Sequence, residues 1–319
     1  MAPASNVPIT NPLSLPSEEP KTIVTVPSVA RSPIRGTTRL LGVIGDPIQH
    51  SLSPVMHNAA IADLGVDYVY LPFHVKPSDL TPAIKGFEAI GVQGFSITLP
   101  HKQTILPLLT RISETAQAIG AVNTVWWTDQ GWSGTNTDVE GFIAPLKSEQ
   151  RDWANLTAVI LGNGGAARAV VAGCALLGCQ QIRVVGRNAP KLSQFVESWQ
   201  QSPFTMTLTA HPWADLPTLL PEAGLVVNAT PIGMAPQTAQ SPLSADLIGH
   251  LTAGAIAYDL IYTPRPTRFL EEAQAQGAAP IDGLEMLVQQ GAAALQIWLQ
   301  QPAPADIMRA ALLDHLAHR

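Results

Sequence analysis

Short apolar runs alternate with amphipathic segments from residue 38 to the end of the chain. Apolar runs bounded by glycine, proline or polar residues predict buried β-strands, whereas apolar positions spaced three or four apart predict helices that bury one face. We expect strands at 40–44, 68–73, 94–99, 156–161, 181–185, 225–228 and 255–260, and a small hairpin from 122–127 and 131–133. We expect helices from Ser53 to near Gly65, at 80–90, after Pro100, and at about 166–177, 285–299 and 303–316.

This order of elements predicts the α/β fold class. A strand, a helix and a second strand at this spacing form a βαβ unit, whose strands lie parallel and whose crossover is right-handed. One series of such units precedes residue 138, and a second series begins at residue 156. We therefore expect two α/β domains that join near Asp138.

Residues 1–36 differ from the rest of the chain in composition. They contain seven prolines and no aromatic residue, and they follow neither a helical nor a strand period. A segment with so few large apolar residues cannot bury enough surface to fold, so we expect a disordered extension. A targeting peptide is an open alternative, although Glu18, Glu19 and the low basic content argue against an organellar signal.

Charged residues are scarce, because they make up 13% of the chain, about half of the roughly 25% typical of soluble proteins. The formal net charge of -6 disfavours binding to nucleic acid or to anionic membranes, so small molecules are the expected partners. The longest wholly apolar run, 169–179, is shorter than the roughly 20 residues of a membrane-spanning helix. These features predict a soluble protein.

The chain has two cysteines, Cys174 and Cys179, which lie in one apolar segment. Two thiols are too few for a disulfide framework or for a structural zinc site. We therefore expect buried free thiols in a core helix. This fits a reducing compartment and predicts a cytoplasmic protein.

A glycine-rich motif follows the strand expected at 156–161 and opens the next helix. It reads Gly162-Asn163-Gly164-Gly165-Ala166-Ala167 and matches G-x-G-x-x-G/A. In such a motif the first glycine allows a tight turn, the second lets the backbone approach a pyrophosphate, and the small third residue lets helix and strand pack closely. A pyrophosphate would also meet free amides and the positive end of the helix dipole. The context favours a dinucleotide site over a merely tight turn.

The end of the following strand indicates which dinucleotide binds. An NAD site usually presents an aspartate or glutamate there for the ribose 2′-hydroxyl, but here Gly186, Arg187 and Asn188 follow the strand. Arg187 can hold a 2′-phosphate through its planar guanidinium and stack on adenine, and Lys191 adds a second charge one helical turn later. The sequence therefore favours NADP(H), with an ordinary surface arginine as the alternative.

Polar residues concentrate at 42–58, where a strand turns into a helix. In an open α/β sheet, ligands bind at the carboxyl ends of the strands. Ser51 and Ser53 would project to the same side of an extended segment and suit a carboxylate or hydroxyl groups. Alternatively, Ser53 only caps the helix. His50 and His57 have no cysteine or carboxylate at ligand spacing, so we expect no metal site.

Two further clusters carry candidate acid–base groups. Lys102 falls in the first helical turn after Pro100, where the helix dipole disfavours a positive charge and suits proton exchange. Asp138 stands at a loop-to-helix junction, where it could instead be only an N-cap. Asn123 lies in a polar segment between them. Each of these positions also has a structural explanation by itself.

Eight motifs in order along the chain resemble the shikimate/quinate dehydrogenase family. They are GVIGDPIQHSLSPVMHN at 42–58, SITLPHK at 96–102, IGAVNT at 119–124, GTNTDVEG at 134–141, GNGGAARA at 162–169, NATPIGM at 228–234, YDLIYTPRPT at 258–267 and GLEMLVQQGA at 283–292. The resemblance extends from Leu40 to the C-terminus. Two positions depart from the commonest pattern, because Ser96 and Gly186 stand where many members have asparagine.

The resemblance implies an enzyme with two α/β domains and a cleft between them. A substrate-binding domain with a mainly parallel sheet would comprise 38–137 and 286–319, and a Rossmann-type NADP-binding domain would comprise 138–285. Members of the family reduce 3-dehydroshikimate to shikimate with NADPH, the fourth step of the route to aromatic amino acids. The implied partners are therefore shikimate or 3-dehydroshikimate and NADP(H), in a monomer or a homodimer.

The resemblance also implies a role for each residue that matches a family motif. Lys102 and Asp138 would form the catalytic pair. The substrate would be bound by Ser51 and Ser53 at its carboxylate, by Thr98, Asn123, Asp138 and Gln290 at its ring hydroxyls, and by Tyr262 near the carboxylate. The cofactor would be bound by Gly162, Asn163, Gly164, Gly165, Ala166, Arg187, Asn188, Lys191, Thr230, Ile261 and Gly283.

Three alternatives stay open on the sequence. The protein could prefer quinate, whose extra C1 hydroxyl lies beside the carboxylate, although paired Ser51 and Ser53 resemble the shikimate-selective form. It could be an inactive NADP-binding relative, against which the joint presence of Lys102 and Asp138 argues. It could be a scaffold without a ligand, which would not explain so many polar groups at strand ends.

Overall fold

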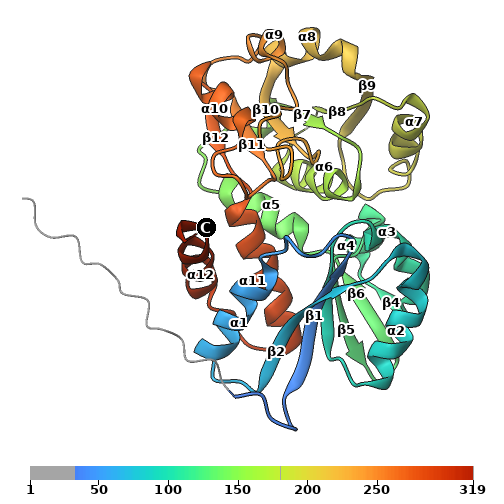
Figure 1. Cartoon of the computed structure of the whole chain (residues 1–319). Coiled ribbons are helices and arrows are strands. Elements are labelled where there is room, and N and C mark those ends of the chain that lie inside the picture. The colour runs from blue at the N-terminus through green and yellow to red at the C-terminus, as the bar shows by residue number, and fades with distance from the viewer. Residues whose placement is uncertain (1–32, 180, 319) are drawn as a thin grey trace, which may run out of the picture.

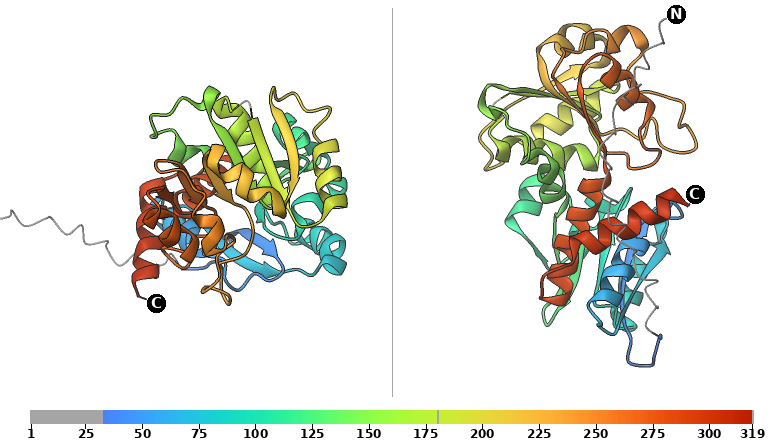
Figure 2. Two further views of the ribbon diagram at one scale, coloured as in Figure 1. Left: turned by 90° about the horizontal axis from the view of Figure 1, so that it is seen from above. Right: turned by 90° about the vertical axis from the view of Figure 1, so that its left-hand side faces the viewer.

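The computed structural model describes residues 33–179 and 181–318, which form two α/β lobes (Figure 1). Each lobe contains one six-stranded sheet. The lobes lie one above the other in Figure 1 and are equally distinct in the right-hand view of Figure 2. Of the extension expected at 1–36, residues 1–32 fall outside the described residues, and 33–36 belong to no helix or strand.

The first sheet is mixed and contains the first six strands. These are β1 (Arg39–Gly45), β2 (Tyr68–His74), β3 (Gly94–Ile97), β4 (Arg111–Ile112), β5 (Thr124–Thr128) and β6 (Gly131–Thr135), in the order β2-β1-β3-β5-β6-β4. Parallel pairing joins β1 to β2 and to β3, and β4 to β6, whereas β5 runs antiparallel to β3 and β6. The expected βαβ unit and the expected hairpin are therefore both present.

The second sheet is wholly parallel. Its strands are β7 (Thr157–Leu161), β8 (Gln181–Gly186), β9 (Thr207–Pro212), β10 (Ala223–Asn228), β11 (Ile256–Asp259) and β12 (Ala279–Ile281), in the order β12-β11-β10-β7-β8-β9. Counted from β9, the strands follow the doubly wound order 3-2-1-4-5-6 of dinucleotide-binding folds. The strand order reverses between β7 and β10, because successive strands are added on one side of β7 and then on the other, and ligands bind in the crevice outside the strand ends there.

Helices cover both faces of each sheet. They are α1 (Ser53–Asp63), α2 (Leu80–Ala89), α3 (His101–Thr104), α4 (Glu114–Ile119), α5 (Asp138–Leu146), α6 (Gly165–Leu177), α7 (Ala189–Glu197), α8 (Leu216–Leu219), α9 (Ala245–Ile248), α10 (Arg268–Ala275), α11 (Leu284–Leu299) and α12 (Ala305–Ala317). Alternate residues of a strand point to opposite faces. Ala158 and Ile160 of β7 accordingly pack with α5, α6 and α7, whereas Val159 and Leu161 pack with α8, α9 and α10.

The last two helices return to the first lobe, although they follow the second lobe in sequence (Figure 1). α11 and α12 share one core cluster with β1, β2 and α1, to which they contribute Val288, Leu295 and Met308 among others. α5 packs against α11 and also against α6 of the second lobe. α5 therefore lies between the two sheets, as Figure 1 and the right-hand view of Figure 2 both show.

The structure differs from the sequence expectations in edge strands, in one helix cap, and in the helices α4, α8, α9 and α10, which were not expected. The strands β4, β9 and β12 were not expected; each lies at the edge of its sheet, where a strand needs no long apolar run. The helix after Pro100 is a single turn. Ser53 is not the N-cap of α1, because the helix begins at Ser53, the cap position is Leu52, and no side chain caps it. The interpretation of Ser53 as only a cap is therefore wrong.

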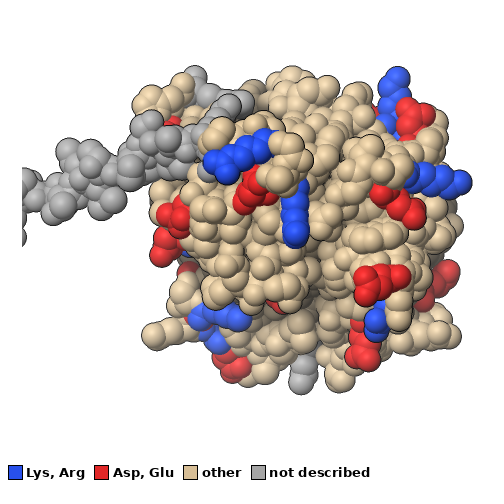
Figure 3. Space-filling model, turned by 90° about the horizontal axis from the view of Figure 1, so that it is seen from below, with Lys and Arg blue, Asp and Glu red and all other residues tan. Residues whose placement is uncertain are grey.

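The expected buried thiols and the scarcity of charged residues can both be compared with the structure. Cys174 and Cys179 are free and buried, as expected, but only Cys174 lies in the helix α6, because Cys179 follows its C-cap. On the face shown in Figure 3, acidic and basic residues lie scattered, and broad uncharged surface separates them. Within 33–179 and 181–318, no helix is both long and apolar enough to cross a membrane.

Candidate active site

A cavity of about 920 Å³ lies between the two lobes and is lined by segments that follow β1, β3, β7, β10 and β11. Every residue that the sequence assigned to catalysis or to the substrate lines it: Ser51, Ser53, Thr98, Lys102, Asn123, Asp138, Tyr262 and Gln290. Six residues assigned to the cofactor also line it: Asn163, Gly164, Gly165, Ala166, Lys191 and Gly283. The fold thus brings both sets of predicted residues to one space.

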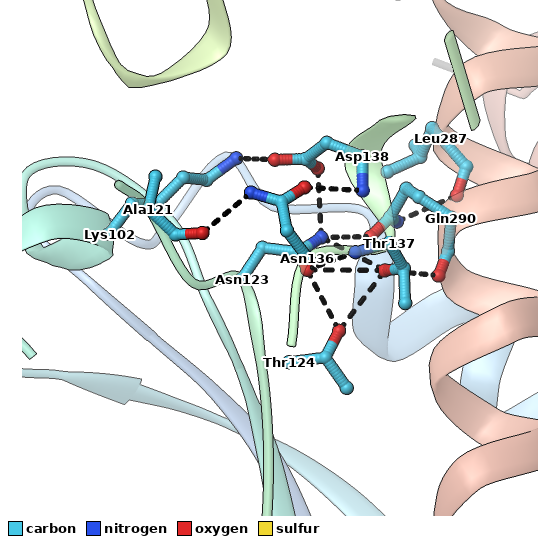
Figure 4. A network of polar contacts seen from close by, with 9 residues as sticks. All are labelled: Lys102, Ala121, Asn123, Thr124, Asn136, Thr137, Asp138, Leu287 and Gln290. Atoms are coloured by element: carbon cyan, nitrogen blue, oxygen red, sulfur yellow. Dashed lines mark hydrogen bonds and ion pairs between the residues drawn. The ribbon is translucent and has the colours of Figure 1, made fainter. Parts of the chain in front are cut away.

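Lys102 and Asp138 form an ion pair inside this cavity (Figure 4). Lys102 comes from α3 and Asp138 is the first residue of α5, and 2.5 Å separates Nζ of the lysine from Oδ2 of the aspartate. The lysine side chain is 18% exposed and the aspartate side chain 7%. Because α3 is only one turn long, the carboxylate at this distance outweighs the helix dipole as the electrostatic partner of the ammonium group.

Asn123 holds the other carboxylate oxygen of Asp138. Its Nδ2 lies 2.8 Å from Oδ1 of Asp138 and 3.4 Å from Oε1 of Gln290, which comes from α11. The Oδ1 atom of Asn123 accepts a bond of 2.7 Å from the backbone amide of Thr137. Asp138 does not cap α5 with its side chain, so the interpretation of this residue as only an N-cap is wrong. Its carboxylate instead orients Lys102 from a buried network (Figure 4).

Three hydroxyl groups form the end of the cavity beside β1. Ser53 and Ser96 are almost fully buried and line the cavity, and Ser51 lies at its edge. The hydroxyl of the buried Tyr70 lies beside those of Ser53 and Ser96, although no hydrogen bond of ordinary geometry joins it to either. Burial raises the pKa of Tyr70, so it is a neutral donor. This end of the cavity can therefore donate several hydrogen bonds to a carboxylate.

His57 packs against Tyr70, behind this hydroxyl cluster. Its ring stacks on Tyr70 at a centroid distance of 4.2 Å and is fully buried. Neither ring nitrogen has a hydrogen-bond partner in the part of the chain that the structure describes. Burial lowers the pKa of His57 to about 3. Among residues 33–179 and 181–318, no group of three histidine, cysteine or carboxylate side chains could hold a metal ion.

The glycine motif has the geometry that its spacing predicts. Gly162 has a φ of +102°, a conformation that favours glycine, and it turns the chain from β7 toward α6. A Cβ atom on Gly164 would meet nothing within 4 Å, so a ligand can approach the backbone there. A Cβ atom on Gly165 would lie 3.7 Å from Cβ and Cδ of Lys102. The amides at the start of α6 therefore face the same space as the catalytic candidates.

A second, smaller cavity of about 230 Å³ adjoins the glycine motif. Gly162, Asn163, Gly164, Gly186, Arg187 and Thr230 line it, together with Trp213 and residues 229, 231 and 232. The side chain of Asn188 does not line it but caps α7 by accepting a bond of 3.0 Å from the amide of Lys191. The predicted cofactor residues thus divide between the two cavities, except for Asn188 and Ile261, which line neither.

Asp259 organises the strand ends beside this cavity. Its carboxylate accepts bonds from Nδ2 of Asn228 at 3.0 Å, from Oγ1 of Thr267 at 2.7 Å and from the amide of Ile261 at 3.1 Å. Burial raises the pKa of Asp259 to about 6, against the effect of these bonds. The carboxylate of Asp259 therefore fixes the backbone at Ile261, beside the strand ends.

The sequence did not single out Arg168, which lines the larger cavity. Its guanidinium donates from Nε to the carbonyl oxygen of Ile119 in the first lobe and from Nη1 to Oγ of Ser198 at 2.9 Å in the second. It also lies 5.4 Å from the ring centroid of Phe195 and 5.1 Å from that of Trp199. Burial lowers the pKa of Arg168 to about 10. The sequence signal that could have identified Arg168 is its charge, because the rest of the helix α6 is apolar.

The charges that line the larger cavity favour an anionic ligand. Lys102, Arg168 and Lys191 bring three positive charges, whereas Asp138 brings one negative charge. A cavity with low-dielectric walls focuses such an excess on whatever enters it. The cavity therefore suits a ligand pair that carries a carboxylate and phosphates.

Comparisons with known proteins agree with this geometry. The family model described as the shikimate dehydrogenase substrate binding domain matches residues 43–125, and that described as the shikimate 5′-dehydrogenase C-terminal domain matches residues 283–313. A relative from Gloeothece citriformis, named shikimate dehydrogenase (NADP(+)), is 61% identical over 283 residues, which cover 89% of this chain and 98% of the relative. The chain belongs to the shikimate dehydrogenase family.

Solved structures of the shikimate dehydrogenase family share this fold. The enzyme from Listeria monocytogenes, in complex with shikimate and NAD, is 35% identical, has a TM-score of 0.78, and covers 88% of this chain and 98% of its own. The enzyme from Thermus thermophilus, in complex with NADP(H) and shikimate, is also 35% identical, with a TM-score of 0.75 and coverage of 86% and 98%. The expectation of two α/β lobes is confirmed.

Proposed function

We propose that the chain catalyses the reversible NADP-dependent interconversion of shikimate and 3-dehydroshikimate, a step of aromatic amino acid biosynthesis. The observation that carries the proposal is the buried Lys102–Asp138 pair, which faces a dinucleotide motif across one cavity. Relatives about 60% identical over most of the chain are named shikimate dehydrogenase (NADP(+)). The inactive relative and the ligand-free scaffold are therefore disfavoured.

Polar groups of the first lobe would orient the substrate. Ser51 and Ser53 would bind its carboxylate at the hydroxyl-lined end of the cavity, close to Tyr262. Burial raises the pKa of Tyr262, so its hydroxyl stays protonated and can donate. The ring hydroxyls would meet Thr98, Asn123, Asp138 and Gln290, all of which line the same cavity.

Lys102 would move the proton of the reacting hydroxyl group. In the oxidation it accepts the proton from the C3 oxygen of shikimate, and in the reduction it returns that proton to the same oxygen. Asp138 holds the Nζ atom at 2.5 Å and is itself held by Asn123, so the amine is oriented before the substrate arrives. In the oxidation the neutral amine form takes up the proton, and in the reduction the ammonium form donates it and stabilises negative charge that develops on the oxygen.

The residues present fit NADP(H). The open backbone at Gly164 and the amides that begin α6 suit a pyrophosphate, and Arg187 with Lys191 suits a 2′-phosphate. Among the described residues, no carboxylate lines the smaller cavity, where an NAD-selective site would place one. When bound, the nicotinamide ring supplies the hydride donor or acceptor. The chain itself contributes binding, orientation and proton transfer.

The proposal is tested by mixing the protein with shikimate and NADP⁺ and following the absorbance of the reduced nicotinamide. We expect turnover with shikimate and release of 3-dehydroshikimate, identified by mass spectrometry. Binding of both ligands without turnover would instead indicate the inactive relative. Absence of NADP⁺ binding would contradict the proposal altogether.

Replacing Arg187 by alanine is expected to change the preference between cofactors. Hydrogen bonds to charged groups contribute about 1.5–3 kcal/mol, so the Kd for NADP⁺ should rise about 10- to 100-fold. The Kd for NAD⁺, which has no 2′-phosphate, should change only a few-fold. Isothermal titration of both cofactors against both proteins measures the difference. Equal weakening of the two cofactors would show that Arg187 does not contact the 2′-phosphate.

Shikimate is expected to be a better substrate than quinate. The extra C1 hydroxyl of quinate would have to enter the region where Ser53 and Ser96 are already only 8% exposed and backed by Tyr70. A site of fixed shape discriminates against one added hydroxyl by roughly 10- to 100-fold. Side-by-side kcat/KM values measure this ratio, and a ratio near one would assign the protein to the quinate-accepting alternative.

We also propose that 38–137 with 286–319 form the substrate-binding domain and that 138–285 form the NADP-binding domain. The packing of α11 and α12 on the core of the first lobe supports the discontinuous first domain. We expect a cytoplasmic protein that is a monomer or a homodimer. Sedimentation analysis of the purified chain determines which of the two it is.

A further inference from the structure

We infer that Trp213 forms one wall of the adenine site and that Arg187 faces it across the smaller cavity. This inference rests on the proposed function, because it assigns a contact to the adenosine half of NADP(H). It adds an aromatic binding residue that lies outside all eight motifs of the sequence.

The position of Trp213 in the fold places it at the ligand edge of the second sheet. It directly follows β9 and opens a short 3₁₀ turn, Trp213–Asp215. β9 is the neighbour of β8, whose end carries Arg187. In a doubly wound sheet the adenosine half of a dinucleotide lies at these strand ends, on the side of the second and third strands.

Trp213 and Arg187 line the same cavity of about 230 Å³. The glycine motif and residues 229–232 close the cavity on its other sides. Two of the lining residues, Gly162 and Gly164, are glycines, which have no side chain on which a base could stack. Among the described residues, Trp213 is the only aromatic residue that lines this cavity, so it offers the only aromatic face to an adenine ring.

Gly186 leaves the end of β8 without a side chain beside the smaller cavity. A Cβ atom on Gly186 would lie 3.0 Å from Cδ2 of Leu192 and 3.5 Å from Oδ1 of Asn163. A side chain at this position would press on Leu192 of α7 and would make ordinary contact with Asn163. Position 186 therefore presents no side chain to the cavity, which leaves room beside Arg187 for a ligand.

The indole ring is held in advance of binding. Trp213 is partly buried and packs against the apolar cluster that β7, β10 and α8 form on one face of the sheet. A side chain already fixed by packing loses little conformational entropy when a ligand stacks on it. A base can thus stack on the indole face, while the guanidinium of Arg187 adds a cation on the opposite side.

The binding experiment uses two ligands that contain adenine but differ in the 2′-phosphate, NADP⁺ and NAD⁺, and the fragment 2′,5′-ADP, which has no nicotinamide. Base–aromatic stacking contributes about 1–3 kcal/mol by alanine substitution, so Trp213→Ala should raise all three Kd values about 5- to 150-fold. Trp213→Phe, which keeps an aromatic face, should raise them much less. Isothermal titration measures each Kd.

The effect on NADP⁺ relative to NAD⁺ distinguishes the contact made by Trp213 from that made by Arg187. Trp213→Ala should weaken NADP⁺ and NAD⁺ by the same factor, because adenine is common to both, whereas Arg187→Ala should weaken NADP⁺ selectively. Trp153→Ala is the matched control, since Trp153 is a partly buried tryptophan of the second lobe that lines neither cavity. Its Kd values should equal those of the unaltered protein.

Two further measurements keep the inference testable if Trp213→Ala does not fold. Trp213→Leu retains apolar packing but has no aromatic face, and it should weaken 2′,5′-ADP as alanine does. In the unaltered protein 2′,5′-ADP should quench part of the tryptophan emission, and Trp213→Phe should remove that quenching. Tight binding of 2′,5′-ADP to Trp213→Leu would overturn the inference. Failure of the unaltered protein to bind NADP⁺ or 2′,5′-ADP would instead contradict the proposed function.

Discussion

Replacement of Lys102 by alanine is expected to lower kcat for shikimate oxidation by about 10²- to 10⁴-fold, the range that one general acid–base group supplies. The expectation follows from the geometry, because Nζ of Lys102 is oriented by Asp138 at 2.5 Å inside the cavity that holds all the substrate candidates. The KM for shikimate should change less, since the groups proposed to bind the carboxylate remain. Steady-state kinetics with varied shikimate separates the two parameters.

Lys191→Ala is the matched control for this prediction. Lys191 carries the same charge and lines the same cavity, but it lies at the start of α7 and is proposed to contact only the cofactor. Its replacement should raise the KM for NADP⁺ and leave kcat within a few-fold of the unaltered value. Thermal unfolding of both variants checks that the lobes remain folded. A kcat near that of the unaltered protein in Lys102→Ala would refute the assignment of this lysine.

Replacement of His57 by phenylalanine is expected to make the protein more resistant to acid. In the folded state burial lowers the pKa of His57 to about 3, whereas the unfolded chain titrates near the ordinary value of about 6.5. Below pH of about 6.5 the unfolded chain therefore binds a proton that the folded chain excludes, so the stability contributed by the neutral ring is lost as the pH falls. One pH unit corresponds to about 1.4 kcal/mol, so the loss reaches about 3 kcal/mol near pH 4.

Phenylalanine cannot take up this proton and preserves the aromatic stack on Tyr70. The free energies of unfolding of the two proteins should be similar near neutral pH and should diverge by about 3 kcal/mol in favour of the variant near pH 4. Urea titrations at several pH values measure the difference. His74, which is exposed and pairs with Asp46, provides a control whose replacement should not reproduce this divergence. Parallel pH profiles for His57→Phe and the unaltered protein would contradict the prediction.

Local sequence patterns predict the buried strands of this fold but not the strands at the sheet edges. The apolar runs at 40–44 and 156–161 and the glycine motif after the second run predict strands and a turn that the structure contains. Edge strands carry no such signal: β9 alternates polar and apolar residues, and β12 contains a proline. Their pairing partners lie elsewhere in the chain, so periodicity alone does not identify them.

The candidate site depends on contacts that no local pattern contains. Lys102 and Ser51 follow strands, so their place at the ligand edge can be argued from the sequence. Gln290 reaches the site from 167 residues beyond Asn123, and only the family resemblance indicated it. Arg168 bonds to a carbonyl 49 residues earlier, and Trp213 follows an edge strand that periodicity missed. These residues become recognisable only when the two lobes are assembled.

The network around Asp138 keeps the groups proposed for proton transfer apart from the groups proposed to hold the hydride donor. Lys102, Asn123, Thr137 and Gln290 bond directly to one another or to Asp138, so the proton-transfer groups form one connected body with the first lobe. The glycine motif belongs to the other sheet, and the second lobe meets this body where α5 packs on α6 and where Arg168 bonds to Ile119. Opening or closing of the cleft would therefore change the hydride-transfer distance but leave the path of the proton unaltered.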